Sequence, residues 1–134
     1  MPDAHSQPLH EAEKEITKAM LGMVVYAVIV RKTPKWDSDA ETRVSLIREH
    51  IQYFIDLEKQ DKVLLAGPFI DDPDRPDGLI ILKGYDSVAE VEAVVAQDVF
   101  HLKGYRTFEI NTWLLNEGAF TVRVALSDQG FRLA

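Results

Sequence analysis

Residues 23–30 read MVVYAVIV, a run that is apolar on both sets of alternating positions and rich in β-branched side chains. Successive side chains of a strand point to opposite sides, so such a run predicts a strand that is buried on both faces. Residues 79–82 (LIIL) show the same pattern. We therefore expect these two strands to lie in the interior of a sheet.

Two further strands are expected at the edges of that sheet. Residues 63–69 (VLLAGPF) contain Pro68, which removes a hydrogen-bond donor and favours a sheet edge or the end of a strand. Residues 106–115 (RTFEINTWLL) alternate apolar and polar side chains, as an edge strand or a strand lining a cavity would. The first and third strands are thus predicted inside the sheet, and the second and fourth outside.

Two capping boxes predict the helices between the strands. Residues 38–41 (SDAE) open a helix that runs to about Gln60, and residues 87–90 (SVAE) open another that ends near Asp98. The resulting order, β-α-β-β-α-β, predicts an α+β fold of the ferredoxin-like type with a four-stranded antiparallel sheet. If helices cover only one face, the other needs a cover, and we expect a second copy of the chain there. The predicted apolar stripe of the first helix comprises Val44, Ile47, Ile51, Phe54 and Ile55.

The length of 134 residues suits one domain flanked by two short additions. Residues 1–22 are predicted to form an N-terminal helical arm, residues 23–116 the ferredoxin-like domain, and residues 117–134 a C-terminal extension. Residues 120–125 alternate apolar and polar side chains. We expect them to form a strand that extends the sheet or crosses to a second copy and enlarges the contact between the two copies.

The composition argues against several classes of protein. There is no cysteine, which excludes disulfides and thiol chemistry and fits a cytoplasmic protein. The longest apolar run, residues 20–30, is too short to cross a membrane. The net charge of −7 disfavours nucleic acid as a partner. The spacing of the four histidines does not support a metal site, and no glycine-rich phosphate loop or dinucleotide motif is present, so no cofactor is expected.

Three residues are candidates for chemistry. His50 lies at the border of the predicted apolar stripe and is either an ordinary boundary histidine or a general acid or base. Asp98 lies where the second helix is expected to end, at the wrong end of the helix dipole, and is either a turn-forming residue or a functional carboxylate. Arg43, two turns before His50, could supply a positive charge to an anionic ligand or could be a solvated helix charge.

Several short motifs, taken together in this order and spacing, resemble the YciI-related (YCII) family between about residues 23 and 116. They are residues 26–29 (YAVI), Arg43 with residues 48–50 (REH), residues 65–68 (LAGP), residues 78–81 (GLII), residues 97–100 (QDVF) with Gly104, and Trp113. The resemblance implies a ferredoxin-like protomer that pairs into a dimeric α/β barrel. It also implies an active-site cleft next to a His and Asp pair, which corresponds to His50 and Asp98. Some relatives are dehydrochlorinases of chlorinated hydroquinone-type aromatics.

Three hypotheses of function follow. The first is a homodimeric small-molecule enzyme in which Asp98 orients His50, and His50 moves a proton during elimination, isomerisation or hydrolysis. The second is a non-catalytic ligand-binding or regulatory dimer, in which Arg43, Tyr26, Trp113 and Phe69 bind a small anion or aromatic molecule; the same four residues would bind the substrate of an enzyme. The third is a purely structural dimer. The sequence indicates neither the substrate nor the reaction.

Overall fold

The computed structural model describes residues 10–72, 74 and 77–133. The chain divides into two compact units. The larger unit is Val24–Leu114, and the other combines the terminal segments Met1–Met23 and Leu115–Ala134. Each unit is described by itself below.

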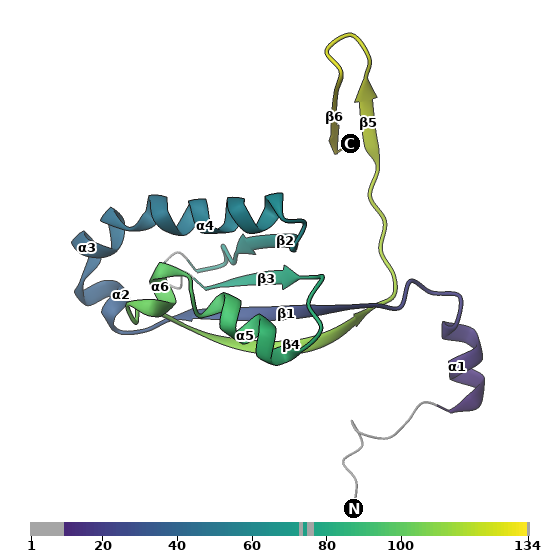
Figure 1. The fold of residues 1–134 in the computed structure, drawn as a ribbon, viewed down its shortest axis with the longest axis horizontal. Helices are drawn as coiled ribbons and strands as arrows, with labels where there is room; N and C mark the ends of the chain where they lie inside the picture. Colours follow the sequence, from purple (N-terminus) through teal and green to yellow (C-terminus); the bar gives the residue numbers. More distant parts are fainter. Residues whose placement is uncertain (1–9, 73, 75–76, 134) are drawn as a thin grey trace, which may run out of the picture. The chain divides into compact units, whose positions relative to one another are not determined.

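The larger unit contains a four-stranded antiparallel sheet (Figure 1). Its strands are β1 (Met23–Lys32), β2 (Val63–Pro68), β3 (Gly78–Leu82) and β4 (Arg106–Leu115), in the order β2-β3-β1-β4. Ile80 of β3 lies opposite Val28 of β1 and Ala66 of β2. The prediction that the two fully apolar runs form the inner strands is therefore confirmed.

The segment predicted as one helix from residue 38 to about residue 60 contains the last residue of one helix and two further helices, so this prediction is wrong. The helices are α2 (Lys35–Ser38), α3 (Ala40–Ser45) and α4 (Ile47–Lys59). Ser38 ends α2 instead of capping a longer helix, and Asp39 leaves the helical conformation (φ −132°, ψ 48°). Tertiary contacts override the local pattern here: the Asp39 carboxylate accepts a hydrogen bond from the buried Tyr105 hydroxyl at 2.8 Å.

The second predicted helix also ends earlier than expected. The helix observed is α5 (Val88–Val95). A separate single turn, α6 (Val99–Leu102), follows it. The predicted N-cap is confirmed, because the Ser87 side chain accepts a hydrogen bond from the Glu90 N–H at 3.2 Å. Asp98 lies between the two helices and is the N-cap of α6.

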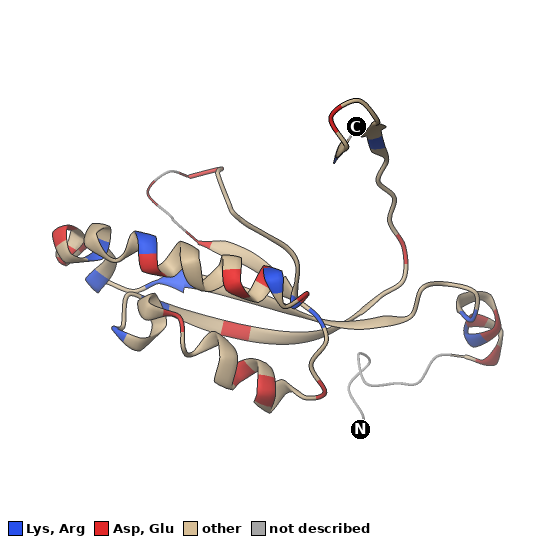
Figure 2. Cartoon of the chain, turned by 45° about the horizontal axis from the view of Figure 1, so that its top comes forward, with Lys and Arg blue, Asp and Glu red and all other residues tan. Residues whose placement is uncertain are grey.

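The helices α4 and α5 lie on the same side of the sheet (Figures 1 and 2). Between α5 and the sheet is a cluster of seven buried residues, against which Phe54 of α4 also packs. The cluster comprises Tyr26, Val28, Val30, Ile80, Leu82, Val91 and Val95. A smaller cluster joins Trp36 of α2 to Val99, Phe100 and Tyr105.

The apolar stripe of α4 is less buried than its pattern predicts. Ile47 and Ile51 are 46% and 49% exposed, and only Leu57 of this helix is fully buried. Acidic and basic residues intermix along the same helix (Figure 2). The apolar stripe of α4 is therefore only partly buried against the sheet, and its isoleucines are available to line a cavity.

The other unit contains α1 (Glu11–Thr17) and the strands β5 (Val122–Ala125) and β6 (Gly130–Leu133). The expectation that residues 120–125 extend the four-stranded sheet is wrong, because β5 pairs with β6 in a separate two-stranded sheet. The chain turns back because Gln129 adopts a left-handed conformation (φ 55°) and the Asp128 carboxylate accepts the Gly130 N–H at 3.1 Å. Phe131 on this hairpin is 78% exposed.

Candidate active site

His50 and Asp98, separated by 48 positions in the sequence, are in direct contact. His50 lies in the first turns of α4, and Asp98 precedes α6. The Nδ1 atom of His50 lies 2.8 Å from Oδ2 and 2.9 Å from Oδ1 of Asp98. An ionised carboxylate only accepts hydrogen bonds, so Nδ1 carries the proton and donates a hydrogen bond to Asp98. In neutral His50 the basic nitrogen is then Nε2.

The carboxylate of Asp98 is held by two donors although the residue is only 1% exposed. In addition to His50, the backbone N–H of Phe100 donates to Oδ1 at 3.3 Å, which makes Asp98 the N-cap of α6. A buried carboxylate needs such partners to offset the loss of water. The turn-forming role that the sequence suggested and the contact with His50 are thus present together.

Aromatic rings fix the plane of the His50 imidazole. The ring of Phe100 stacks on it with centroids 4.5 Å apart and an interplanar angle of 25°. The ring of Phe54 meets it edge to face at 5.1 Å. The His50 side chain is only 17% exposed, so the ring is packed on two sides and hydrogen-bonded at a third.

A cavity of about 500 Å³ adjoins His50. Its walls come mainly from α4 and from the neighbouring parts of β2 and β3, and they include the isoleucines of the α4 stripe. His50 is part of the wall, so its imidazole is in reach of a small molecule held there. The lining residues are Val30, Trp36, Ile47, His50, Ile51, Phe54, Ile55, Glu58, Ala66, Gly67, Pro68, Asp77, Gly78, Leu79, Ile80, Phe100 and Arg106.

Arg106 and Asp77 line this cavity, although neither residue was predicted from the sequence to be part of the site. The Arg106 guanidinium lies over the ring of Trp36, 4.6 Å from its centroid, and 5.4 Å from that of Phe100. Burial lowers the pKa of Arg106, while the nearby carboxylates of Asp98 and Asp77 act in the opposite direction. The sequence did contain a signal for Arg106. Its side chain is on the same face of β4 as that of Phe108, so a charged residue occupies an inward position of this strand.

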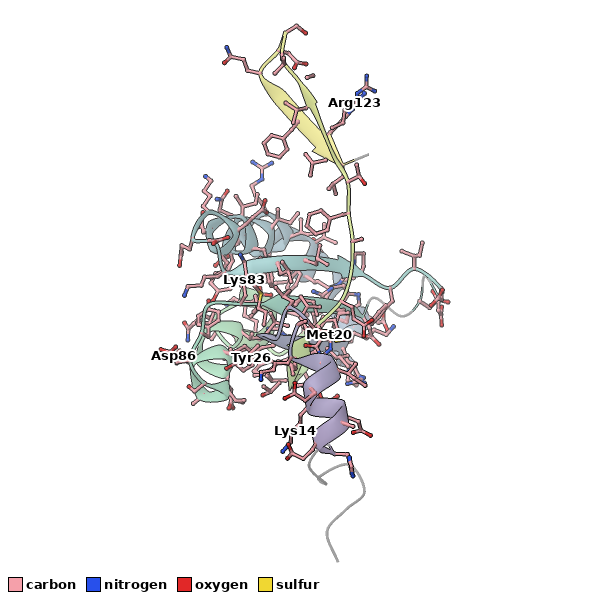
Figure 3. All side chains as sticks on the ribbon, turned by 90° about the vertical axis from the view of Figure 1, so that its right-hand side faces the viewer. Lys14, Met20, Tyr26, Lys83, Asp86 and Arg123 are labelled. Carbon is pink, nitrogen blue, oxygen red and sulfur yellow. The ribbon has the colours of Figure 1, made fainter. Side chains whose placement is uncertain are left out.

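Arg43 and Tyr26, both predicted to bind a ligand, are absent from the cavity wall. The Nε of Arg43 donates to the Trp36 carbonyl oxygen at 2.9 Å, and its guanidinium lies 4.3 Å from the centre of the Trp36 ring. Tyr26 is 4% exposed and belongs to the main core cluster, inside the folded body of the larger unit (Figure 3). Its alternation parity, shared with Val28, directs it into the helix-covered face of the sheet.

Phe69 and Trp113 do not line the cavity either. Phe69 follows β2, is 39% exposed, and is held by its backbone N–H, which donates to the carbonyl oxygen of Asp77 at 2.9 Å. Trp113 is 44% exposed. Its parity is opposite to that of Phe108 and Ile110, which pack on the core cluster, so its side chain lies on the other face of the sheet.

A second histidine lies beside Asp98. The Nδ1 of His101 is 3.9 Å from the Asp98 carboxylate and 3.0 Å from the carbonyl oxygen of Val95, to which it donates. Burial is the largest influence on the pKa of His101 and lowers it, although the Asp98 charge opposes this shift. His101 is not part of the cavity wall. We therefore assign it to the support of the turn that carries Asp98.

The described residues were searched for a metal site and for a membrane-spanning helix. Within these ranges, no set of three or more His, Cys, Asp or Glu side chains is arranged to hold a metal ion. No helix in the described part of the chain combines the length and apolarity needed to span a bilayer.

Neither a protein-family model nor a curated protein sequence matches the chain. A similar solved structure is that of 5-chloro-2-hydroxyhydroquinone dehydrochlorinase (TftG) from Burkholderia phenoliruptrix AC1100, in complex with 2,5-dihydroxybenzoquinone. The two chains superpose with a TM-score of 0.51 and are 19% identical, over 66% of this chain and 92% of the other. At this identity the similarity concerns the fold: the chain has an α+β fold of the ferredoxin-like type, distantly similar to that of this dehydrochlorinase.

Proposed function

We propose that this protein is a small-molecule enzyme of the YciI-related type in which His50 and Asp98 form an acid-base dyad. The observation that carries the proposal is the 2.8 Å contact between His50 Nδ1 and Asp98, made by an imidazole that also lines a 500 Å³ cavity. A hydrogen-bonded base next to a half-open, mostly apolar hollow is an arrangement suited to proton transfer to or from a bound substrate.

The dyad can drive an elimination. In a hydroxylated ring that carries the leaving group, a proton first shifts from one hydroxyl to the carbon that bears the leaving group, which gives the keto form. His50 Nε2 then takes the proton of a second hydroxyl. The O–H electron pair becomes the new C=O bond, and the neighbouring ring π pair shifts to form a double bond to the carbon that bears the leaving group. The leaving group departs with its own bonding pair. Asp98 stabilises the resulting imidazolium and keeps the ring in the tautomer that exposes a lone pair at Nε2. The same proton transfers would serve an isomerisation, or a hydrolysis in which His50 activates water.

The dehydrochlorinase with the similar fold suggests where to look for a substrate. Its name describes the loss of chloride from a hydroxylated aromatic ring, and it was solved with 2,5-dihydroxybenzoquinone bound. We propose chlorinated, hydroxylated six-membered rings as the first substrate class to test. The cavity supports this choice because Trp36, Phe54 and Phe100 give it flat aromatic walls.

The test is to incubate the purified protein with chlorinated hydroxyhydroquinones and with the matching compounds that lack chlorine. Chloride release, measured by ion chromatography, and the absorption spectrum of the quinoid product are followed. We expect chloride release from the chlorinated compounds, and a much slower rate for Asp98→Asn. Retention of every compound unchanged would contradict dehydrochlorination, and saturable binding without conversion would favour the non-catalytic ligand-binding alternative.

We also propose that two copies pair through the sheet face opposite the helices, as in a dimeric α/β barrel. Leu65 and Trp113 are 67% and 44% exposed, and both side chains are on the sheet face that points away from the helices. Exposed apolar side chains on one sheet face favour a protein partner. Light scattering coupled to size exclusion should give twice the 15.2 kDa chain mass, and the Leu65→Asp, Trp113→Asp double variant should give the single mass. A native protein that elutes with the mass of one chain would contradict the dimer.

A further inference from the structure

We propose that the ligand of the cavity carries an apolar substituent on its ring, such as an alkyl chain, and that Ala66 is the specificity-determining residue that makes room for it. The proposal rests on the proposed function for the location of the site and adds the size and shape of the ligand. The ring lies beside His50, and the substituent lies between α4 and β2.

The cavity is larger than a single ring requires. Its volume is about 500 Å³. An apolar cavity of about 150 Å³ in another protein is enough to bind benzene. A six-membered ring with small substituents therefore fills only part of the cavity, and the remainder is available to a further group on the ligand.

The cavity continues along α4 beyond His50. Ile55 and Glu58 also line it, five and eight residues further along this helix, or about 7.5 and 12 Å along its axis. The aromatic rings of Phe54 and Phe100 both contact His50 itself. The aromatic part of the wall is thus at the His50 end, which suits the ring of the ligand.

The part of the wall beyond His50 is largely aliphatic and accessible. Ile51 and Ile55 both line the cavity and are 49% and 37% exposed. A substituent that covers them removes apolar surface from water, and this favours an apolar group over a polar one.

Ala66 forms the sheet side of this part of the cavity. It lies opposite Ile80, a member of the core cluster on the helix-covered face, so its side chain is on that face too. Ala66 is nevertheless exposed and belongs to the cavity wall. Its single methyl group leaves the space between β2 and α4 open.

The position of Ala66 along β2 brings it level with the two isoleucines. Residues 60–62 join α4 to β2, and the two elements run in opposite directions (Figure 1). Ala66 is three residues from the start of β2, or about 10 Å at the rise of a strand. Ile55 and Ile51 are about 6 and 12 Å from the end of α4 at Lys59. A larger side chain at residue 66 would therefore occupy the place of the substituent.

A hydroxyl group on the ring can fix the direction of the substituent. His50 donates a hydrogen bond from Nδ1 to Asp98, so Nε2 is left to accept one from a ring hydroxyl. A group on the opposite side of the ring from that hydroxyl then points away from His50.

Three probes that share a phenol ring and differ in chain length test this directly. Phenol, 4-ethylphenol and 4-butylphenol have no chain, a short chain and a longer chain opposite the hydroxyl, and their dissociation constants can be measured by titration calorimetry or NMR. Burial of one methylene group strengthens binding about threefold. We therefore expect 4-butylphenol to bind about tenfold more tightly than 4-ethylphenol.

Substitution of Ala66 should remove this gain. In Ala66→Leu we expect phenol to bind as in the native protein, and 4-butylphenol to bind no more tightly than 4-ethylphenol. The matched control is Ala93→Leu, the same change at an exposed position of α5 outside the cavity wall, which should retain all three affinities. Should Ala66→Leu fail to fold by circular dichroism, Ala66→Val takes its place, and the gain should fall to about threefold.

The proposal is overturned if 4-butylphenol binds no more tightly than phenol, if none of the three probes binds, or if Ala66→Leu weakens all three equally or changes none. These outcomes do not depend on catalysis. The expected chain preference without chloride release from any chlorinated compound would contradict only the proposed function. Chloride release without the chain preference would contradict only the present inference.

Discussion

Replacing His50 by Asn is expected to lower turnover of the substrate by about 10²–10⁴-fold, the contribution typical of a positioned general acid or base. The asparagine amide can still donate to Asp98 from nearly the position of Nδ1, so the buried carboxylate keeps a partner. It has no basic nitrogen in place of Nε2, so the proton transfer is lost while the dyad's supporting hydrogen bond is retained. The measurement is the initial rate with the compound that the chloride assay identifies.

A matched control lies on the same helix. Gln52 is exposed and its side chain contacts Asp56, one turn further along α4, away from the dyad. Gln52→Ala should retain the native rate and the native unfolding midpoint. A His50→Asn protein that turns over substrate at the rate of the Gln52→Ala control would remove His50 from the mechanism.

The sheet could be predicted from the sequence because its signals are local. The run at residues 23–30 needs no knowledge of its neighbours to predict a strand buried on both faces, and β1 and β3 are the inner strands. The interruption of the long helix could not be predicted in this way. It depends on Tyr105 reaching Asp39 and on Trp36 packing edge to face on Phe100 at 5.3 Å, contacts between residues more than 60 positions apart.

The residues of the candidate site also differ in whether the sequence could predict them. The pairing of His50 with Asp98 was expected from a family resemblance, and composition and spacing alone left ordinary alternatives for both residues. Arg43 was preferred as the cation because it shares a helix face with His50, and sequence spacing cannot show that it lies outside the cavity wall. Arg106 could have been found from its inward parity on a strand, a local signal whose meaning depends on which helix covers that face.

Truncation of Phe100 is expected to have the largest effect on stability. Phe100 is 2% exposed, and its ring contacts Trp36, Tyr105 and His50 as well as the Arg106 guanidinium. Phe100→Ala should therefore lower the free energy of unfolding by about 3–5 kcal/mol, since a buried phenyl ring is replaced by a cavity that these large, mutually packed rings can fill only in part. Urea denaturation measures this change.

Leu102, two positions after Phe100, provides a comparison that separates the loss of packing from a change in helix propensity. Leu102 lies on the same short helix, α6, but is 62% exposed, so Leu102→Ala should change the free energy of unfolding by no more than about 0.5 kcal/mol. A ring at Phe100 also fixes the plane of His50, so a less disruptive Phe100→Leu variant should remain folded and still lose part of the turnover. Equal stability losses for Phe100→Ala and Leu102→Ala would mean that α6 unfolds as a unit in both, and that the contacts of the Phe100 ring do not hold the site together.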